Sequence, residues 1–150
     1  MADRHTIRKE IGALVESQLL AVLSTHRDGQ PYANLVAFVT SEDLAEIYFA
    51  TARSTRKFTN IRQDNRIAML IDNRSNQSTD FHEAAAVTVV GSVVELEGKG
   101  KDEVDKKYIA KHPCLEEFLK APTTALLRVA VSRYIMVTRF REVFELHMGA

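Results

Sequence analysis

The spacing of hydrophobic residues near the start of the chain predicts one amphipathic helix. Apolar residues between Ile7 and Val15 recur at the interval of a helix face, so we expect a helix at roughly 6–16 with Thr6 as its N-cap. Its apolar stripe should pack on a core along one face only.

Most of the remaining hydrophobic positions predict β-strands. The first two strands flank the turn at Asp28-Gly29 and should form an antiparallel hairpin. Gly91, inside a long apolar run, is expected to mark a bulge or a sharp bend. The predicted strands are QLLAVLSTH, YANLVAFVT, AEIYFAT, RIAMLID, the run Ala84 to Leu96, and TALLRVAVSRYIMVTRF, with REVFELH trailing the last.

Short helices and one polar loop fill the intervals between these strands. A helix after AEIYFAT should have Ser54 as its N-cap, with Phe58 and Ile61 turned inward. The segment NRSNQSTDFHE has the length of a loop that is either functional or mobile. The charge run KGKDEVDKK is interpreted as a solvated helix face, with Asp102–Lys106 and Glu103–Lys107 pairs, that ends before Pro113.

These elements together predict a mainly β (α+β) fold, a six-stranded antiparallel split β-barrel with short peripheral helices. The 150 residues fit a single domain covering 1–150.

Composition restricts the partners and the compartment. Lys plus Arg and Asp plus Glu each number 20, so the formal net charge is zero, and no long basic tract indicates a nucleic-acid or anionic-membrane surface. The only cysteine, Cys114, allows no intramolecular disulfide and fits a reducing, cytoplasmic compartment. The charged N-terminus does not resemble a signal peptide, and the longest apolar run is too short to span a bilayer.

Several familiar motifs fail on inspection. His82-Glu83 lacks the second histidine of a metalloprotease helix, because position 86 is Ala. Gly98-Lys99-Gly100 has Glu103 where a dinucleotide loop needs its third glycine. We therefore expect no metal site and no standard nucleotide loop.

The stretch ATARSTRKFTNI, from Ala50 to Ile61, is the strongest candidate for chemistry. The start of a helix leaves backbone N–H groups unpaired and carries partial positive charge, which suits an anion. Basic residues there oppose the helix dipole at a cost of about 0.3–1 kcal/mol each, which a bound phosphate would explain. An exposed, capped, basic helix end remains the alternative interpretation. The residues that would bind phosphate are Thr51, Ser54, Thr55, Arg56 and Lys57.

The order STRKFTNIRQDNRIAML after FAT, preceded by AVLSTHRDGQPYANLVAF, resembles the flavin-binding split-barrel family related to pyridoxamine 5′-phosphate oxidase. The resemblance covers most of the chain. It implies that the third strand ends in a Thr and that an Arg-Lys pair at the next helix start holds the phosphate of FMN. The corresponding residues in this sequence are Thr51, Thr55, Arg56 and Lys57. It also implies a flavin ring lying along the backbone of Leu35, Val36, Ala37 and Phe38, and a homodimer whose second subunit completes the cofactor site.

Departures from that pattern narrow the expected function. Asn34 stands where the oxidases place an Arg, and Ala86 stands near where they use a Gln to touch the flavin. The sequence ends without their Arg-rich, Trp-containing segment, so oxidation of vitamin B6 is not expected. The polar loop and the YIAKHPCLEEFL stretch look more like general flavin members and the haem-utilisation branch. Asn73, Ser75 and Asn76 could reach the ribityl chain or the ring edge, and a plain surface loop is an equal alternative.

The resulting expectation is an FMN-binding oxidoreductase that transfers a hydride at flavin N5 to or from a small-molecule substrate. No side chain is identified as catalytic. The alternatives are a haem-binding or haem-degrading protein, with His147 or His112 as iron ligand, and a non-catalytic flavin-binding protein. A deazaflavin could replace FMN, because a phosphate site does not report the attached ring.

Overall fold

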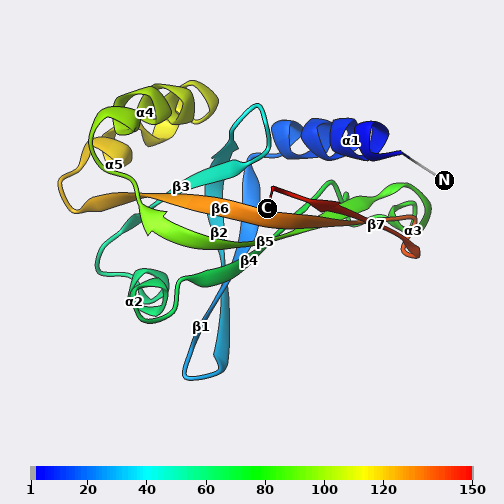
Figure 1. The fold of residues 1–150 in the computed structure, drawn as a ribbon, viewed down its shortest axis with the longest axis horizontal. Helices are drawn as coiled ribbons and strands as arrows, with labels where there is room; N and C mark the ends of the chain where they lie inside the picture. Colours follow the sequence, from blue (N-terminus) through cyan, green and yellow to red (C-terminus); the bar gives the residue numbers. More distant parts are fainter. Residues whose placement is uncertain (1–2, 150) are drawn as a thin grey trace.

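The computed structural model describes residues 3–149 of the chain. Figure 1 shows the strands at the centre of the molecule with the helices around them. The elements in chain order are α1 (Arg4–Ser17), β1 (Leu20–Arg27), β2 (Gln30–Thr40), β3 (Glu46–Ala52), α2 (Arg56–Gln63), β4 (Arg66–Asp72), α3 (Asp80–Glu83), β5 (Ala85–Glu95), α4 (Lys99–Lys111), a 3-10 turn (Pro113–Leu115), α5 (Glu116–Lys120), β6 (Thr124–Thr138) and β7 (Glu142–His147).

Six strands close an antiparallel barrel. Neighbouring strands follow the order β3-β2-β1-β4-β5-β6, and β3 also pairs with β6, which completes the ring. The trailing segment forms β7, which pairs only with the second half of β6 and lies outside the barrel. The expected six-stranded split barrel is thereby confirmed.

The β1–β2 hairpin forms where the sequence predicts it. Arg27 pairs with Gln30, so the loop has two residues, Asp28 and Gly29, with φ of 51° and 79°. Two consecutive positive φ values are typical of the turn whose twist matches that of the flanking strands, and Asp-Gly tolerates them.

The predicted irregularity at Gly91 is a β-bulge. Val90 pairs with Arg133 but Gly91 pairs with Val131, so Ser132 is an extra residue on β6. Before the bulge, β6 pairs with β3 along its other edge, and after it with β7. The bulge therefore lies where β6 leaves the barrel wall and continues as an extension with β7.

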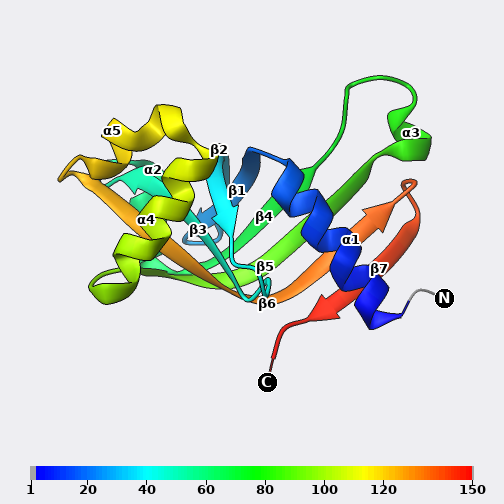
Figure 2. The same ribbon diagram turned by 90° about the horizontal axis from the view of Figure 1, so that it is seen from above.

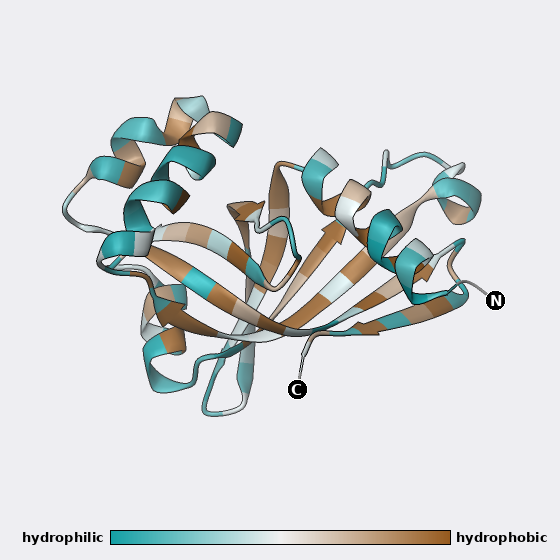
Figure 3. Cartoon of the chain, turned by 45° about the horizontal axis from the view of Figure 1, so that its top comes forward, coloured by the Kyte–Doolittle hydropathy of each residue, from teal (hydrophilic) through white to brown (hydrophobic). Residues whose placement is uncertain are grey.

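Helix α1 packs its apolar stripe against β2, β4 and β7. The four residues expected to face inward, Ile7, Ile11, Leu14 and Val15, are all buried. Figure 2 shows α1 lying across the strands, and its last turn meets the end of α4, where the Lys111 ammonium donates a 3.4 Å hydrogen bond to the Val15 carbonyl. In Figure 3, hydrophobic residues concentrate on the strands, while α1 and α4 carry much polar surface.

Two local predictions are corrected. The N-cap of α1 is Asp3, whose side chain accepts a 2.8 Å hydrogen bond from the Thr6 backbone N–H, so Thr6 lies inside the helix. In α4 the ion pair between residues four apart joins Lys101 and Asp105 at 2.9 Å, one position earlier than the first predicted pair. The solvated-face interpretation is unchanged by this shift.

None of the helices within residues 3–149 is long and apolar enough to cross a membrane.

Candidate functional site

Strands β2 and β3 separate beside the start of α2. Their pairing covers only Phe38–Thr40 against Ile47–Phe49, whereas β1 pairs with β2 from Gln30 to Ala37. The first part of β2 is thus bonded to a strand on one edge only. This opening is the split of the barrel, and it leaves one backbone edge of that part of β2 without a neighbouring strand.

The N-cap of α2 is Thr55, one residue later than predicted. Thr55 has extended backbone angles, and its hydroxyl accepts a 3.3 Å hydrogen bond from the Phe58 backbone N–H. The Thr51 hydroxyl, at the end of β3, lies 2.8 Å from the Thr55 hydroxyl. Ser54 is exposed and lies outside the helix. The cap residue therefore links the end of β3 to the first turn of α2.

Two cations occupy the first turn of α2, where no acidic residue is present. The Arg56 guanidinium lies over the Tyr32 ring, 5.3 Å from its centroid. Lys57 is half-buried, and burial lowers the pKa of its ammonium. Within residues 3–149, neither cation has a carboxylate at ion-pair distance.

Arg53, in the same basic stretch, is already paired with a carboxylate. Its two terminal nitrogens each donate a 2.7 Å hydrogen bond to the Glu95 carboxylate. This bidentate pair ties the β3–α2 connection to β5. Arg53 therefore has a structural partner that Arg56 and Lys57 lack.

A buried amide, Asn60, lies near Arg56 and was missed by the sequence reasoning. Asn60 is 2% exposed, and its amide nitrogen donates a 3.0 Å hydrogen bond to the Thr25 hydroxyl. The side-chain oxygens of Asn60 and Asn34 have no partner among the described residues. Asn60 lines a cavity with Arg56 and Tyr32. The sequence feature that could have identified Asn60 is its position four residues after Arg56, which places both on the same helix face.

The four β2 residues expected along a flavin ring alternate between the core and the outside. Val36 and Phe38 are buried in the core, whereas Leu35 is 62% exposed and Ala37 is half-buried. For Val36 and Phe38, only the backbone is left to contact a ligand. The side chains of Leu35 and Ala37 lie on the outer face beside the split.

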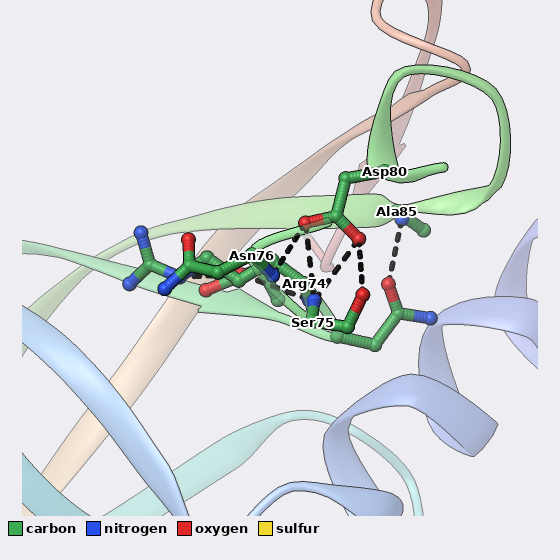
Figure 4. Close-up of polar contacts among 7 residues, drawn as sticks. Arg74, Ser75, Asn76, Asp80 and Ala85 are labelled. Atoms are coloured by element: carbon green, nitrogen blue, oxygen red, sulfur yellow. Dashed lines mark hydrogen bonds and ion pairs between the residues drawn. The ribbon is translucent and has the colours of Figure 1, made fainter. Parts of the chain in front are cut away.

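Asn73 is not brought to this cluster. It follows β4, whose first residue lies near the end of α2, so the length of the strand separates Asn73 from α2. Its side-chain oxygen accepts a 2.8 Å hydrogen bond from the Ala85 backbone N–H, across the base of the following loop, residues 73–84 (Figure 4). The role of Asn73 within one subunit is therefore to hold that loop.

The two histidines considered as iron ligands have other partners. His112 is 5% exposed, and its Nε2 lies 2.8 Å from the carbonyl oxygen of Phe38. His147 is exposed on β7, with its Nε2 3.0 Å from a Glu145 carboxylate oxygen. The Nε2 atom of His112 is therefore occupied inside the core, and only its Nδ1 would be left for iron.

The groups at the start of α2 have the chemistry that suits an anion such as a phosphate monoester. Hydroxyls, the unpaired N–H groups of a helix start and two unpartnered cations converge there. A partly desolvated Lys57 without a counter-charge is costly, and an anion would offset that cost.

The closed barrel, with its outer strand and its short helices, defines the split-barrel class of fold. The sequence profile of the pyridoxamine 5′-phosphate oxidase family matches residues 7–138, and the chain belongs to this family. No curated protein matches the sequence.

Solved structures share the fold at low identity. A haem binding protein from Mycobacterium smegmatis aligns with a TM-score of 0.85 and 15% identity over 98% of this chain, which spans 59% of that protein. General Stress Protein 26 from Bacillus anthracis aligns with a TM-score of 0.71 and 20% identity over 93% of this chain and 98% of its own. A FAD-binding protein from Mesorhizobium loti aligns with a TM-score of 0.68 and 16% identity over 85% of this chain and 91% of its own. The fold thus has flavin-binding and haem-binding relatives.

Proposed function

We propose that the protein is an FMN-binding flavoprotein that acts as an oxidoreductase on a small molecule. The observation that carries the proposal is the pair Arg56 and Lys57, two cations without carboxylate partners at a helix start, one of them partly desolvated. Membership of the pyridoxamine 5′-phosphate oxidase family supports a flavin as the phosphate-bearing group.

In this proposal the phosphate is held by the first turn of α2. Arg56 can grip two phosphate oxygens with its planar guanidinium, while Lys57 adds a second positive charge. The hydroxyls of Thr51 and Thr55 donate to the Ala52 carbonyl, at 3.2 and 3.0 Å, and would add donors to the phosphate only by giving up these bonds. Ser54 can approach from the exposed side. The free half of the Asn60 amide is its oxygen, an acceptor, so in this cavity it would face a hydrogen-bond donor of the ligand and not the phosphate.

The backbone of Leu35, Val36, Ala37 and Phe38 would lie along the flavin ring, at the split between β2 and β3. Bound FMN supplies hydride transfer at N5, and the protein contributes binding, orientation and exclusion of water. In this segment β2 is held by β1 up to Ala37 and by β3 from Phe38 onward.

The phosphate contacts are tested by comparing FMN with riboflavin, which lacks the phosphate. The wild-type protein should bind FMN much more tightly than riboflavin, as measured by quenching of flavin fluorescence. Loss of two charge-assisted contacts, at about 1.5–3 kcal/mol each, should raise the Kd for FMN at least about 100-fold in the Arg56→Ala/Lys57→Ala variant. The variant should then no longer distinguish FMN from riboflavin.

Arg53→Ala is the matched control, because Arg53 belongs to the same stretch but is bound to Glu95. It should keep the preference for FMN, and circular dichroism should show that both proteins are folded. A double variant that still prefers FMN, or an equal loss in Arg53→Ala, would show that the phosphate is not held by α2.

The absorption spectrum of the purified protein separates the alternatives. A flavin spectrum that nicotinamide nucleotides or other donors bleach fits the oxidoreductase, and a flavin that no donor reduces fits a non-catalytic carrier. A Soret band would instead support haem binding. Mass analysis of the released cofactor distinguishes FMN from a deazaflavin.

We further propose a homodimer that buries the outer face of β1 and β2. Leu20 and Leu35 are 52% and 62% exposed on this face, with Val22 between them because it pairs with Leu35. Such exposed apolar residues in adjacent strands indicate an interface, which would bring the second subunit to the split.

Sedimentation of the protein tests the dimer. The wild type should sediment as twice its 16.9 kDa chain mass, and Leu20→Glu should shift it towards the monomer. Val94→Glu is the control, because Val94 is similarly exposed at 46% but lies near the end of β5. A wild type that sediments at 16.9 kDa would exclude the interface.

A further inference from the structure

The pairing of β2 with β3 stops at a defined point. The last pair is Phe38 with Phe49, and the same register would next join Ala37 to Ala50. Both strands continue beyond this last pair, but they no longer bond to each other. The ends of the strands therefore do not explain why the split begins here.

The hydroxyl of Tyr108, on α4, occupies the position of the missing pair. It donates a 3.2 Å hydrogen bond to the Ala37 carbonyl and accepts one from the Ala50 backbone N–H. At the turn end of the same ladder, the Ser41 N–H bonds the Glu46 carbonyl. Because hydrogen-bonded pairs alternate along an antiparallel ladder, Ala37 and Ala50, four pairs further on, would also bond to each other. The Tyr108 hydroxyl thus replaces a bond between the strands.

Tyr108 is held firmly in this position. It is 1% exposed and packs in the small core cluster between α4, α5 and the barrel, together with Val39, Leu119 and Leu126. Burial raises the pKa of the Tyr108 hydroxyl to about 12, although the hydrogen bond from Ala50 acts in the opposite direction. The hydroxyl therefore keeps the proton that it donates to β2.

His112 holds the next carbonyl of β2 in a similar way. It lies four residues after Tyr108, and the centroids of the two rings are 5.0 Å apart. Its Nε2 lies 2.8 Å from the Phe38 carbonyl oxygen, and because a carbonyl only accepts, Nε2 is the donor. Ala37 and Phe38 belong to the β2 backbone that would lie along the flavin ring. The end of α4 therefore fixes how this backbone is presented.

We propose that Tyr108 is a positioning residue that sets where the split begins and so holds the β2 backbone in place for the flavin ring. The inference rests on the proposed function, and it adds α4 to the elements that form the site. With the hydroxyl in place, β3 cannot pair with Ala37. Without it, the carbonyl of Ala37 and the N–H of Ala50 lose their partner, and direct pairing between them satisfies both. The split then becomes shorter by one pair.

Strand pairing is tested in the flavin-free protein by nuclear magnetic resonance. In Tyr108→Phe, a nuclear Overhauser cross-peak should appear between the amide protons of Ala37 and Ala50, and it should be absent in the wild type. Tyr108→Leu, which also withdraws the end of the ring, should show the same cross-peak. This measurement needs no cofactor, so it is independent of the proposed function.

The consequence for the site is tested with FMN and riboflavin. Tyr108→Phe should weaken the binding of both by the same factor, at least about threefold, because the split holds the ring and not the phosphate. The preference for FMN should therefore remain, unlike in Arg56→Ala/Lys57→Ala. The absorption bands of the bound flavin should shift, because its backbone contacts change; a loss of stability alone would not move them.

Tyr134→Phe is the matched control. Tyr134 is 0% exposed, and its hydroxyl donates a 2.8 Å hydrogen bond to the Leu44 carbonyl, at the β2–β3 turn instead of at the split. The substitution removes the same atom from the same kind of buried bond. It should lose stability to urea but keep the flavin affinity and the spectrum of the wild type.

Three outcomes would overturn the inference: no cross-peak in either Tyr108 variant, flavin affinity and spectrum that Tyr108→Phe leaves unchanged, or an equal loss of flavin affinity in Tyr134→Phe. A wild-type protein that binds neither FMN nor riboflavin would instead overturn the proposed function, and the amide cross-peak would still decide whether Tyr108 sets the split.

Discussion

The bulge at Gly91 leads to a sharp prediction about stability. A Cβ atom built at this position would lie 2.4 Å from the carbonyl oxygen of Ala130 and 2.9 Å from a Val129 methyl group. The methyl group can rotate away, but the carbonyl belongs to the part of β6 that is paired with β3 on one edge and with β5 on the other. The clash therefore has to be relieved by moving a strand that closes the barrel.

We expect Gly91→Ala to lower the free energy of unfolding by about 2–3 kcal/mol, the upper part of the range for overpacked sites. For a chain of this size that corresponds to a drop in Tm of roughly 5–10 °C. Urea unfolding followed by circular dichroism gives the free energy directly, and calorimetry gives the Tm.

The same substitution at Gly12 is the control, because a Cβ there meets nothing within 4 Å. Gly12 lies inside α1, where alanine is the better helix former, so Gly12→Ala should stabilise by about 0.5–1 kcal/mol. If Gly91→Ala stayed within about 0.5 kcal/mol of the wild type, the close approach of β5 and β6 would be refuted.

Two further predictions concern the helices. Thr55→Ala should lower the free energy of unfolding by about 1 kcal/mol, because it removes the N-cap of α2. Ser54→Ala should change it by only a few tenths of a kcal/mol. Equal effects of the two substitutions in urea unfolding would contradict the assignment of the cap. Burial lowers the pKa of Lys111 to about 8. Between that pH and the unfolded pKa near 10.4, the unfolded chain binds more protons than the native one. The free energy of unfolding should therefore rise with pH over this interval. Lys111→Met should reduce this rise, and a wild-type-minus-variant difference that is the same at about pH 7 and about pH 9 would argue against the buried ammonium.

The barrel was predictable because its signals are local. The apolar runs identified each strand, Asp28-Gly29 identified the hairpin, and Gly91 identified the bulge, since each feature depends on residues adjacent in the sequence. The helix starts were each misplaced because two residues could cap. Ser54 and Thr55 have equally suitable hydroxyls, and only the backbone angles of Thr55 and its contact with Thr51 decide between them.

The site was predictable only as far as the basic stretch extends. Arg56 and Lys57 are adjacent in the sequence, so their shared position at a helix start could be inferred. Arg53 could not be separated from them, because its partner Glu95 lies on β5, far along the chain. The contact between Asn60 and Thr25 could not be predicted for the same reason, because it depends on how α2 packs against β1.

The bulge at Ser132 also separates the barrel from the extension formed by β6 and β7. Before it, β6 closes the barrel with β3, whose end leads directly into α2 and its cations. After it, β6 pairs with β7, and the turn between them carries Phe140 to the 73–84 loop. One strand thus serves both the barrel and its extension. Gly91→Ala, at the junction, should therefore weaken flavin binding as well as lower the free energy of unfolding.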